Sequence, residues 1–456
     1  MISFVASFAF DEYDVFMNLR RIIIIGIVAV NLVLTFMLWR QGSVDLFTSD
    51  VPGDGLIAYG RFGGLLAQLF IVLELILVSR ITYIEQEFGH VQMNKIHRLV
   101  GYFLLGFFFV HPVFLIWGYA AQSKRSFIGQ FVNFLVNWEN VFLAFVGLVL
   151  FIALIVFSIA IIRRKVRYET WYVAHLGMYI AIVLSFVHQT EFGDFVGNVG
   201  WTMYWNVLNL GALGLLFLYR FGRPALWYYK HQFVIQKVIR EGGGVTSLYI
   251  SGKNLKQFHF QPGQFANLLI LSRKHFFAHP FSFSAAPNSE YLRFSIKDCG
   301  DYTCKVCLCE AGTRVIIDGP LGVFTEQKSV MDKYLLVAGG IGITPIRALA
   351  EALSREGKDV VLMYSARTKD DLIFYDELRE LSCKSSYVLS NVVESERLEE
   401  FEYGRIDLER IKNSVPDFAQ RDAYICGPGP MIISLEQQLK GAGVPSAQLH
   451  SELFMM

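Results

Sequence analysis

Four histidines in two apolar segments are the residues of this sequence best suited to chemistry. His97 and His111 are 14 positions apart in one segment, and His175 and His188 are 13 positions apart in the other. At about 1.5 Å of rise per residue, each pair spans roughly 20 Å of helix, a large part of the ~30 Å hydrocarbon core of a membrane. Ionisable side chains inside a bilayer are costly and usually functional, and histidine is a standard axial ligand of haem iron. The pattern therefore predicts two helices that hold two haem groups, one above the other.

The alternative interpretation of each histidine is a packing residue, which is the commoner role of a lone histidine in an apolar helix. Two pairs with matched spacing favour haem ligation instead. A 14-residue step leaves two side chains roughly 40° apart around an ideal helix, whereas a 13-residue step leaves them roughly 140° apart. We therefore expect the helix that carries His175 and His188 to be distorted or tilted. Alternatively, the length of the histidine side chains compensates for the angle between them.

The composition divides the chain into two unlike halves. Its 456 residues allow two or three domains, and 54% of them are hydrophobic. Residues 1–220 are dominated by apolar runs, whereas residues 231–456 resemble a soluble α/β protein. The net charge of +1 gives no indication of nucleic-acid binding. All six cysteines lie in the second half, which fits a reducing compartment on that side.

Six apolar runs predict six membrane helices, at about 22–39, 62–79, 97–118, 140–162, 171–188 and 203–219. Twelve flanking basic residues fall on one side of this arrangement and four on the other. The twelve include Arg163, Arg164, Lys165 and Arg167. The positive-inside rule then predicts a multi-pass protein of the plasma (inner) membrane with both termini in the cytoplasm.

This orientation pairs the histidines across two parallel helices. His97 with His175 would hold an inner haem, and His111 with His188 an outer one. The longest outer loop, residues 119–139, carries an amphipathic patch of Phe127, Phe131, Phe134 and Leu135. We expect that patch to lie on the membrane as a lid.

The predicted domains are a transmembrane di-haem domain (1–220), a linker (221–230), an antiparallel β-barrel for FAD (231–325) and an α/β nucleotide-binding domain (326–456). Short alternating runs punctuated by Gly and Pro favour the barrel. From residue 332 onward, buried strands alternate with helical patterns. Such alternation predicts a parallel sheet with a nucleotide at the carboxyl ends of its strands.

Two motifs of the barrel region suit a flavin dinucleotide. In the run from His279 to Ser284, an aromatic ring could stack on a flavin and a hydroxyl could bind the edge of its ring. Arg293 and Lys297 then precede a glycine turn that ends at a hydroxyl, a combination suited to a pyrophosphate. The candidate FAD ligands are His279, Pro280, Phe281, Ser282, Ser284, Lys297, Gly300 and Thr303.

A glycine turn in the last domain predicts the nicotinamide dinucleotide site. The run Gly339-Gly-Ile-Gly-Ile-Thr-Pro345 follows a strand and opens a helix, so backbone N–H groups can approach phosphate. Ser365 and Arg367 end the next strand, where they could bind a 2′-phosphate, which favours NADPH over NADH. The alternative is that Arg367 is an ordinary solvated charge. The candidate residues are Gly339, Gly340, Gly342, Thr344, Pro345, Ser365, Arg367, Gly427 and Pro428.

Three residues near the end of the chain are candidates for the hydride-transfer site. Cys426 follows a strand where a nicotinamide could reach the flavin, and the ring of Phe454, beyond Glu452, could cover the flavin. A second cysteine pattern, Cys299, Cys304 and Cys307, has the C-x4-C-x2-C spacing of plant-type iron–sulfur proteins. A fourth ligand is poorly placed, so we do not expect a cluster there.

Taken together, these motifs make the chain resemble the NADPH oxidase and ferric reductase superfamily from about residue 60 onward. The resemblance rests on the paired histidines and on the order His279-Pro-Phe-Ser, Gly300-Asp-Tyr-Thr, Gly339 to Pro345 and Cys426-Gly-Pro. It implies FAD, NAD(P)H and two b-type haems, with the family's haem ligands at His97, His111, His175 and His188. The chain lacks a calcium-binding extension and a large outer cap, so its compact form resembles a self-sufficient bacterial member without an obligate protein partner.

The expected function is electron transfer across a lipid membrane, from cytosolic NAD(P)H through FAD and two haems to an outer acceptor. Dioxygen, giving superoxide, is the first choice, and ferric chelates are the second. A donor of electrons to a periplasmic partner protein is a third interpretation. A haem-binding scaffold with an inactive reductase half is a fourth, which the intact glycine and Cys-Gly-Pro motifs disfavour.

Overall fold

The computed structural model describes residues 19–159, 166, 168–272, 277–384, 387–395, 397 and 399–453. The chain divides between Tyr219 and Arg220 into two compact units. We call residues 19–219 the helical unit and residues 220–453 the sheet unit.

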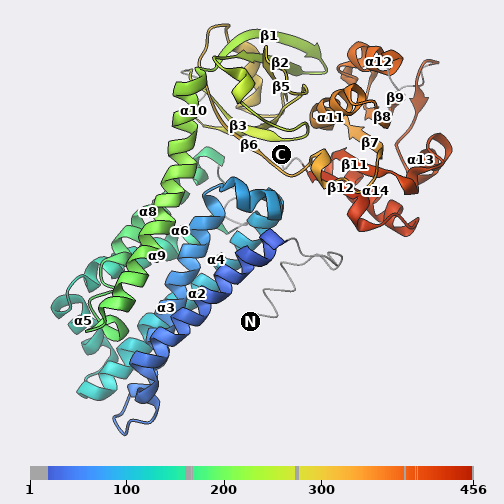
Figure 1. Cartoon of the computed structure of the whole chain (residues 1–456). Coiled ribbons are helices and arrows are strands. Elements are labelled where there is room, and N and C mark those ends of the chain that lie inside the picture. The colour runs from blue at the N-terminus through green and yellow to red at the C-terminus, as the bar shows by residue number, and fades with distance from the viewer. Residues whose placement is uncertain are drawn as a thin grey trace. The chain divides into compact units, whose positions relative to one another are not determined.

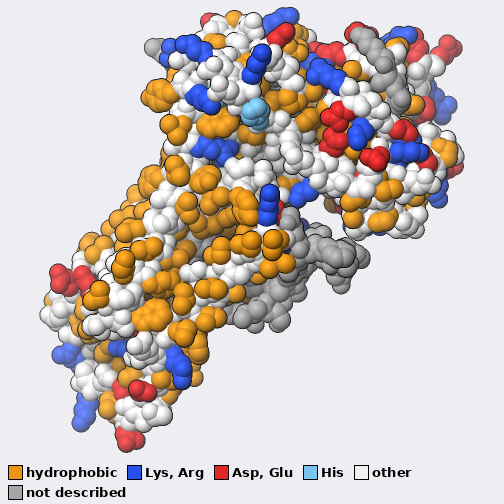
Figure 2. Space-filling view, in the orientation of Figure 1, with side chains coloured by type: hydrophobic (Ala, Val, Ile, Leu, Met, Phe, Trp, Pro, Cys, Tyr) orange, Lys and Arg blue, Asp and Glu red, His pale blue; other side chains and the backbone are white. Residues whose placement is uncertain are grey.

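The helical unit is a bundle of apolar helices (Figure 1). Its helices are α2 (Leu19–Ser43), α3 (Asp54–Val78), α4 (Thr82–Ser123), α5 (Phe127–Asn137), α6 (Val141–Ser158), α8 (Tyr168–Phe186) and α9 (Val199–Phe217), with short 3₁₀ turns η1 (Val44–Phe47) and η2 (Gly193–Phe195). Hydrophobic side chains cover much of the visible face of these helices (Figure 2), as a lipid-facing surface requires. The basic residues Arg163, Arg164, Lys165 and Arg167 lie outside the described residues.

Five helices in the described part of the chain are long and apolar enough to cross a membrane. These five spans are Leu19–Phe47, Asp54–Val78, Thr82–Ser123, Val141–Ser158 and Val199–His231. The predicted span at 171–188 corresponds to α8, which is helical but is not one of the five. Glu169, Thr170 and His175 make α8 less apolar than its neighbours.

The first part of the sheet unit contains two three-stranded antiparallel sheets. A π-helical turn (Leu218–Gly222) and α10 (Arg223–His231) precede it. One sheet has the order β1-β2-β5 and the other the order β4-β3-β6, and isolated bridges at Val234–Arg314 and Phe283–Phe294 join them. The strands are β1 (Val234–Gly242), β2 (Val245–Ser251), β3 (Phe265–Ile270), β4 (His279–Ser282), β5 (Leu292–Lys297) and β6 (Val315–Leu321). Buried aromatic and branched side chains, among them Phe233, Phe283 and Phe294, fill the space between the sheets.

The second part of the sheet unit is a six-stranded parallel sheet with helices on both faces. Its strand order is β10-β9-β8-β7-β11-β12. The strands are β7 (Lys333–Gly339), β8 (Asp359–Ala366), β9 (Tyr387–Val393), β10 (Glu402–Tyr403), β11 (Asp422–Gly427) and β12 (Leu449–Leu453). The helices are α11 (Ile343–Arg355), α12 (Tyr375–Lys384), α13 (Leu408–Ser414) and α14 (Gly429–Gly441).

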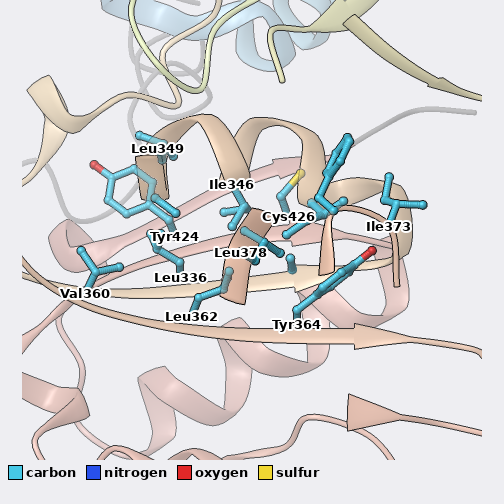
Figure 3. Close-up of a cluster of buried hydrophobic side chains, with 14 of the residues drawn as sticks. Leu336, Ile346, Leu349, Val360, Leu362, Tyr364, Ile373, Leu378, Tyr424 and Cys426 are labelled. Carbon is cyan, nitrogen blue, oxygen red and sulfur yellow. The ribbon is translucent and has the colours of Figure 1, made fainter. Parts of the chain in front are cut away.

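Alternate residues of the central strands face opposite layers of helices. Leu336 packs with Ile346 and Leu349 of α11 (Figure 3), whereas Leu335 and its alternates pack toward α13 and α14. Strands buried on both faces read as continuous apolar runs, which is why this part of the sequence predicts a parallel sheet. The carboxyl ends of β7, β8 and β11 therefore meet at one edge.

Candidate functional site

The four histidines form two pairs inside the helical unit. The ring centroids of His97 and His175 are 6.1 Å apart, and those of His111 and His188 are 6.3 Å apart. A metal–imidazole bond is about 2 Å long in protein sites, so two rings on opposite sides of one metal ion have centroids roughly 6 Å apart. The two pairs therefore have the separation that bis-histidine ligation of iron requires.

Three of these histidines use their Nδ1 atoms to contact the protein. His111 donates to the carbonyl oxygen of Gly60 at 2.9 Å, and Nδ1 of His175 lies 3.0 Å from Oγ of Ser158. Nδ1 of His97 contacts the Glu74 carboxylate. A histidine that binds a metal usually holds its second nitrogen in this way, which orients the ring and leaves the other nitrogen for the metal.

The 13-residue spacing of the second pair is explained by the end of α8. This helix ends at Phe186, and His188 lies in the turn that follows. The next residue, Gln189, holds this turn: its amide nitrogen donates to Oε1 of Gln68 at 2.8 Å, and its oxygen accepts from the indole of Trp205 at 2.9 Å. Because His188 is outside the helix, its direction is not set by the 100° helical step.

Glycines of α3 make room for the outer pair. A Cβ atom on Gly64 would overlap the imidazole ring of His111, and one on Gly60 would come within 2.9 Å of the Leu115 side chain. Small residues let two helices approach closely in a membrane. The sequence interpretation did not single out these glycines, although their run in α3 was a visible signal.

A cavity lies beside the outer histidine pair. Its lining is mostly apolar and includes Phe108, Leu148 and, from α5, Phe131, Phe134 and Leu135. The amphipathic patch predicted in the 119–139 loop thus forms a helix that lines this cavity. Trp138, which follows α5, completes that wall.

A polar group that includes Arg61 and Asp194 forms part of the cavity lining. Arg61 Nη1 lies 3.2 Å from Asp194, and the Ser43 hydroxyl donates to the same carboxylate at 2.5 Å. Burial raises the pKa of Asp194 above its usual value, although the contacts with Ser43 and Arg61 act in the opposite direction.

The predicted flavin motif lies on β4. The Ser282 hydroxyl is buried, and it has no hydrogen-bond partner among the described residues. A buried hydroxyl normally has a partner, so this atom fits a ligand group such as the edge of a flavin ring. Phe281 is half-buried one position earlier, Pro280 is exposed, and the ring of His279 lies 3.8 Å from that of Tyr302. Tyr302 was inside the Gly300–Thr303 motif, but the sequence interpretation did not assign it a role.

The side chains of Ser284 and Arg293 contact other protein groups. The Ser284 hydroxyl is fully buried and lies 2.7 Å from that of Ser295, so its prediction as an FAD ligand is not supported. The Arg293 side chain is also buried and donates to the Glu377 carboxylate at 2.9 Å. Arg293 alternates with Leu292 and Phe294, which fill the core between the sheets, so its side chain lies on the other face of β5.

The predicted pyrophosphate turn is held by its own hydroxyl. Thr303 accepts from the Cys299 amide at 2.9 Å and donates to the Gly300 carbonyl at 3.2 Å. Thr303 begins a 3₁₀ helix, η5 (Thr303–Leu308), rather than an α-helix. Nζ of Lys297 lies 3.8 Å from Asp371. Lys297 and Gly300 are therefore at the surface of the unit, while Thr303 shapes the turn.

The glycine turn after β7 packs directly on the end of β11. Gly340 has a φ of +53°, a conformation that favours glycine. A Cβ atom on Gly342 would overlap the backbone of Cys426, and one on Gly339 would come within 2.9 Å of Pro428. The structure thus brings the predicted Gly339–Gly342 and Cys426–Pro428 motifs together at the carboxyl edge of the sheet, where α/β proteins bind nucleotides.

Thr344 and Pro345 lie just inside α11 and are buried. The Thr344 hydroxyl donates to the carbonyl of Ile341 at 3.0 Å. These two residues therefore shape the start of the helix, and the backbone of the turn before them remains as the candidate phosphate contact.

A carboxylate that the sequence interpretation missed lies at the predicted ribose position. The buried hydroxyl of Ser365 donates to Oε1 of Glu394 at 2.7 Å, and Arg405 approaches Oε2 of Glu394 at 3.7 Å. Arg367 is exposed. An acidic residue at this edge typically binds the ribose hydroxyls of NAD, whereas a 2′-phosphate needs a cation. Glu394 follows β9, so the only sequence signal was a glutamate after an apolar strand.

The Cys426 thiol is covered by β12. It is fully buried, and it donates to the Glu452 carbonyl at 3.4 Å. Burial and the nearby Glu452 carboxylate raise the pKa of this thiol well above its usual value. The thiol is therefore neutral, and it lies buried at the carboxyl end of β11 beside the Gly339–Gly342 turn. Phe454 lies outside the described residues.

The Cys299, Cys304 and Cys307 thiols are free in this structure. Cys304 donates to the Asp301 carbonyl and Cys307 to the Cys304 carbonyl, at 3.4 and 3.3 Å. Among the residues that the structure describes, no group of three or more His, Cys, Asp or Glu side chains is arranged to hold a metal ion.

Three family models match successive parts of the chain. Residues 63–186 match the ferric reductase like transmembrane component, residues 232–325 an FAD-binding domain and residues 336–437 an oxidoreductase NAD-binding domain. The chain has the architecture of the ferric reductase and NADPH oxidase superfamily. It is an oxidoreductase of that type, which confirms the family resemblance seen in the sequence.

Two relatives of this oxidoreductase each match less than half of the chain. The ferredoxin reductase component of the 3-ketosteroid-9-alpha-monooxygenase of Mycolicibacterium smegmatis is 33% identical over 204 residues, which are 43% of this chain and 56% of that protein. The glycine betaine monooxygenase reductase subunit of Pseudomonas aeruginosa is 27% identical over 235 residues, 49% of this chain and 64% of the relative. The chain thus spans less than two thirds of the length of either relative.

Solved structures give low overall similarity. The flavohemoglobin of Malassezia yamatoensis is 16% identical, covers 86% of this chain and 96% of its own, and has a TM-score of 0.45. The FAD/NAD binding domain of the nitric oxide dioxygenase of Vibrio cholerae is 22% identical, covers 49% and 97%, and has a TM-score of 0.43.

Proposed function

We propose that this oxidoreductase carries electrons from NAD(P)H through FAD and two b-type haems to an acceptor on the outer face of the plasma membrane. The proposal rests mainly on the two histidine pairs, in which the ring centroids are 6.1 and 6.3 Å apart. The same chain also matches FAD- and NAD-binding domains. When bound, FAD accepts a hydride and releases single electrons, which the haems relay.

The protein residues supply binding and orientation in this proposal. His97 and His175 would hold the inner haem, and His111 and His188 the outer one. Ser282 and Phe281 would contact the flavin, and the Gly339–Gly342 turn would bind the pyrophosphate of the nicotinamide nucleotide. The cytoplasmic position of both termini rests on the distribution of basic residues along the sequence.

Dioxygen, giving superoxide, is the acceptor that we favour. The cavity beside His111 and His188 has a mostly apolar lining, which suits a small neutral molecule better than a charged chelate. A ferric chelate is the second candidate, because residues 63–186 match a family described as ferric reductase like.

The test uses the full chain purified in detergent and supplemented with FAD. We expect NAD(P)H to reduce the haem absorption bands under anaerobic conditions, and air to reoxidise them with superoxide-dependent cytochrome c reduction. Haems that stay reduced in air but discharge to ferric chelates would make the protein a ferric reductase. A preparation without haem bands would contradict the histidine assignment.

A further inference from the structure

Glu74 is a buried acidic residue on the membrane helix α3. Its side chain is only 14% exposed, and its carboxylate contacts Nδ1 of His97. An acidic side chain near the end of an apolar helix is costly unless it has a function or a partner. The contact with His97 identifies the partner.

The contacts of the other histidines differ from this one. His111 donates to a backbone carbonyl, and His175 lies beside a hydroxyl. Of these three Nδ1 contacts in the described part of the chain, the one made by His97 involves a group that can carry a full negative charge, the Glu74 carboxylate. The His97/His175 pair thus has a carboxylate in direct contact with one ring, whereas the His111 ring contacts a backbone carbonyl.

We propose that Glu74 is a positioning residue that lowers the reduction potential of the inner haem relative to the outer one. This inference rests on the proposed function. Oxidised haem iron carries one more positive charge than reduced iron, so a nearby carboxylate stabilises the oxidised state. The attraction is strong because the low dielectric constant of a membrane interior screens it weakly.

The hydrogen bond acts in the same direction as the charge. A carboxylate that accepts a hydrogen bond from Nδ1 of a ligating histidine makes the other ring nitrogen a stronger electron donor to the metal. Contacts of this kind change the reduction potential of the metal. A lower potential at the His97/His175 pair makes transfer to the His111/His188 pair downhill. The protein thereby favours the direction in which electrons leave the flavin.

The experiment is an anaerobic potentiometric titration of the haem absorption bands in the full-length protein and in Glu74→Gln. The amide keeps an oxygen that can accept the His97 proton but removes the charge. We expect two reduction waves in the unsubstituted protein, and in the variant an upward shift of the lower-potential wave alone. Asp54→Asn is the matched control, because Asp54 is a buried carboxylate at the other end of α3, roughly 30 Å away. It should leave the lower-potential wave in place.

The outcomes separate this inference from the proposed function. If Glu74→Gln retains both haems and both waves are unchanged, Glu74 has no such role while the electron-transfer proposal stands. If Glu74→Gln loses haem, Glu74→Asp restores the charge and should restore both the haem content and the low potential. A Glu74→Asp protein that regains haem but has a raised lower wave would overturn the inference. If the unsubstituted protein holds no haem, the proposed function itself fails.

Discussion

His188 shows how a single side chain can be placed for ligation although its position in the sequence disfavours it. It lies in the turn after α8, and its ring faces that of His111 at 6.3 Å. Gln189 holds this turn through the amide of Gln68 and the indole of Trp205. Outside the helix, the side chain can point at its partner without distorting any backbone hydrogen bond of α8.

We expect His188→Ala to remove the outer haem and to retain the inner one. The haem content, measured by the pyridine haemochrome spectrum, should fall by about half, because iron held by two axial histidines is released when one is removed. NAD(P)H should still reduce the remaining haem, but reduction of the outer acceptor should be lost. His259→Ala, at an exposed position in the sheet unit, should keep the full haem content. Full haem content in His188→Ala would contradict the pairing.

Glu394 gives a prediction about the nicotinamide nucleotide. Its carboxylate, bound by Ser365, should accept the ribose hydroxyls of NADH and repel the 2′-phosphate of NADPH. We expect Glu394→Gln to raise kcat/KM for NADPH relative to NADH by roughly tenfold, or about 1.4 kcal/mol. The ratio is measured from initial rates with both nucleotides. Glu399→Gln, an exposed residue nearby in the sequence, should not change it. An unchanged ratio in Glu394→Gln would contradict this role of Glu394. It would favour the sequence-based hypothesis that Ser365 and Arg367 bind the 2′-phosphate of NADPH.

At the scale of elements, the edge formed by β7, α11 and β11 depends on close backbone contact. Gly342 lies at the start of α11, and a Cβ atom there would overlap the carbonyl of Cys426. Backbone cannot move aside as a flexible side chain can. The glycine turn and the end of β11 can therefore approach this closely only because Gly342 has no side chain.

We expect Gly342→Ala to destabilise the sheet unit by about 2 kcal/mol, the usual cost of forcing an extra carbon into a packed region. Thermal unfolding followed by flavin fluorescence measures this effect, and the KM for the nicotinamide nucleotide should rise because the turn is displaced. Gly441→Ala is the matched control, since a Cβ atom on Gly441 at the end of α14 meets nothing within 4 Å. Equal stability of the two variants would show that the turn adapts.

At the scale of the whole molecule, a partly buried ionic network joins the two parts of the sheet unit. Arg293 on β5 and Arg347 on α11 both bind the Glu377 carboxylate of α12, at 2.9 and 2.8 Å. Burial alone would raise the pKa of Glu377, but the hydrogen bonds and charges of the two arginines outweigh it and lower that pKa. The network therefore couples the β1–β6 region to the parallel sheet.

The network predicts acid-dependent stability. Because the pKa of Glu377 is lower in the folded state, its contribution is complete above its unfolded pKa of about 4.5 and is lost as the pH falls through the folded value. We expect Glu377→Gln to unfold at a lower temperature than the unsubstituted protein at pH 7, and the difference to shrink below about pH 4.5. Glu380→Gln, an exposed residue of the same helix, should have a smaller effect. A difference that persists unchanged into acid would exclude a role of the Glu377 charge.

The sequence by itself determined the features that depend on local spacing. These features are the two histidine pairs, the strand–glycine–helix turn at Gly339 and the alternation of strands and helices after residue 332. Each is visible as a pattern within a short stretch of sequence. Local rules of helix rise, glycine conformation and strand burial are sufficient for such features. The family came from a resemblance rather than from these rules, because its motifs occur in a fixed order along one chain.

Only the tertiary structure decided which distant groups meet. Glu74 contacts His97 from another helix, Glu394 reaches Ser365 from the next strand, and Arg293 contacts Glu377 of α12. The burial of Ser284 and Cys426 also depends on neighbours far along the chain. Such contacts are set by where each element ends and which strand lies beside it. Long-range packing fixes both, and no pattern of neighbouring residues records them.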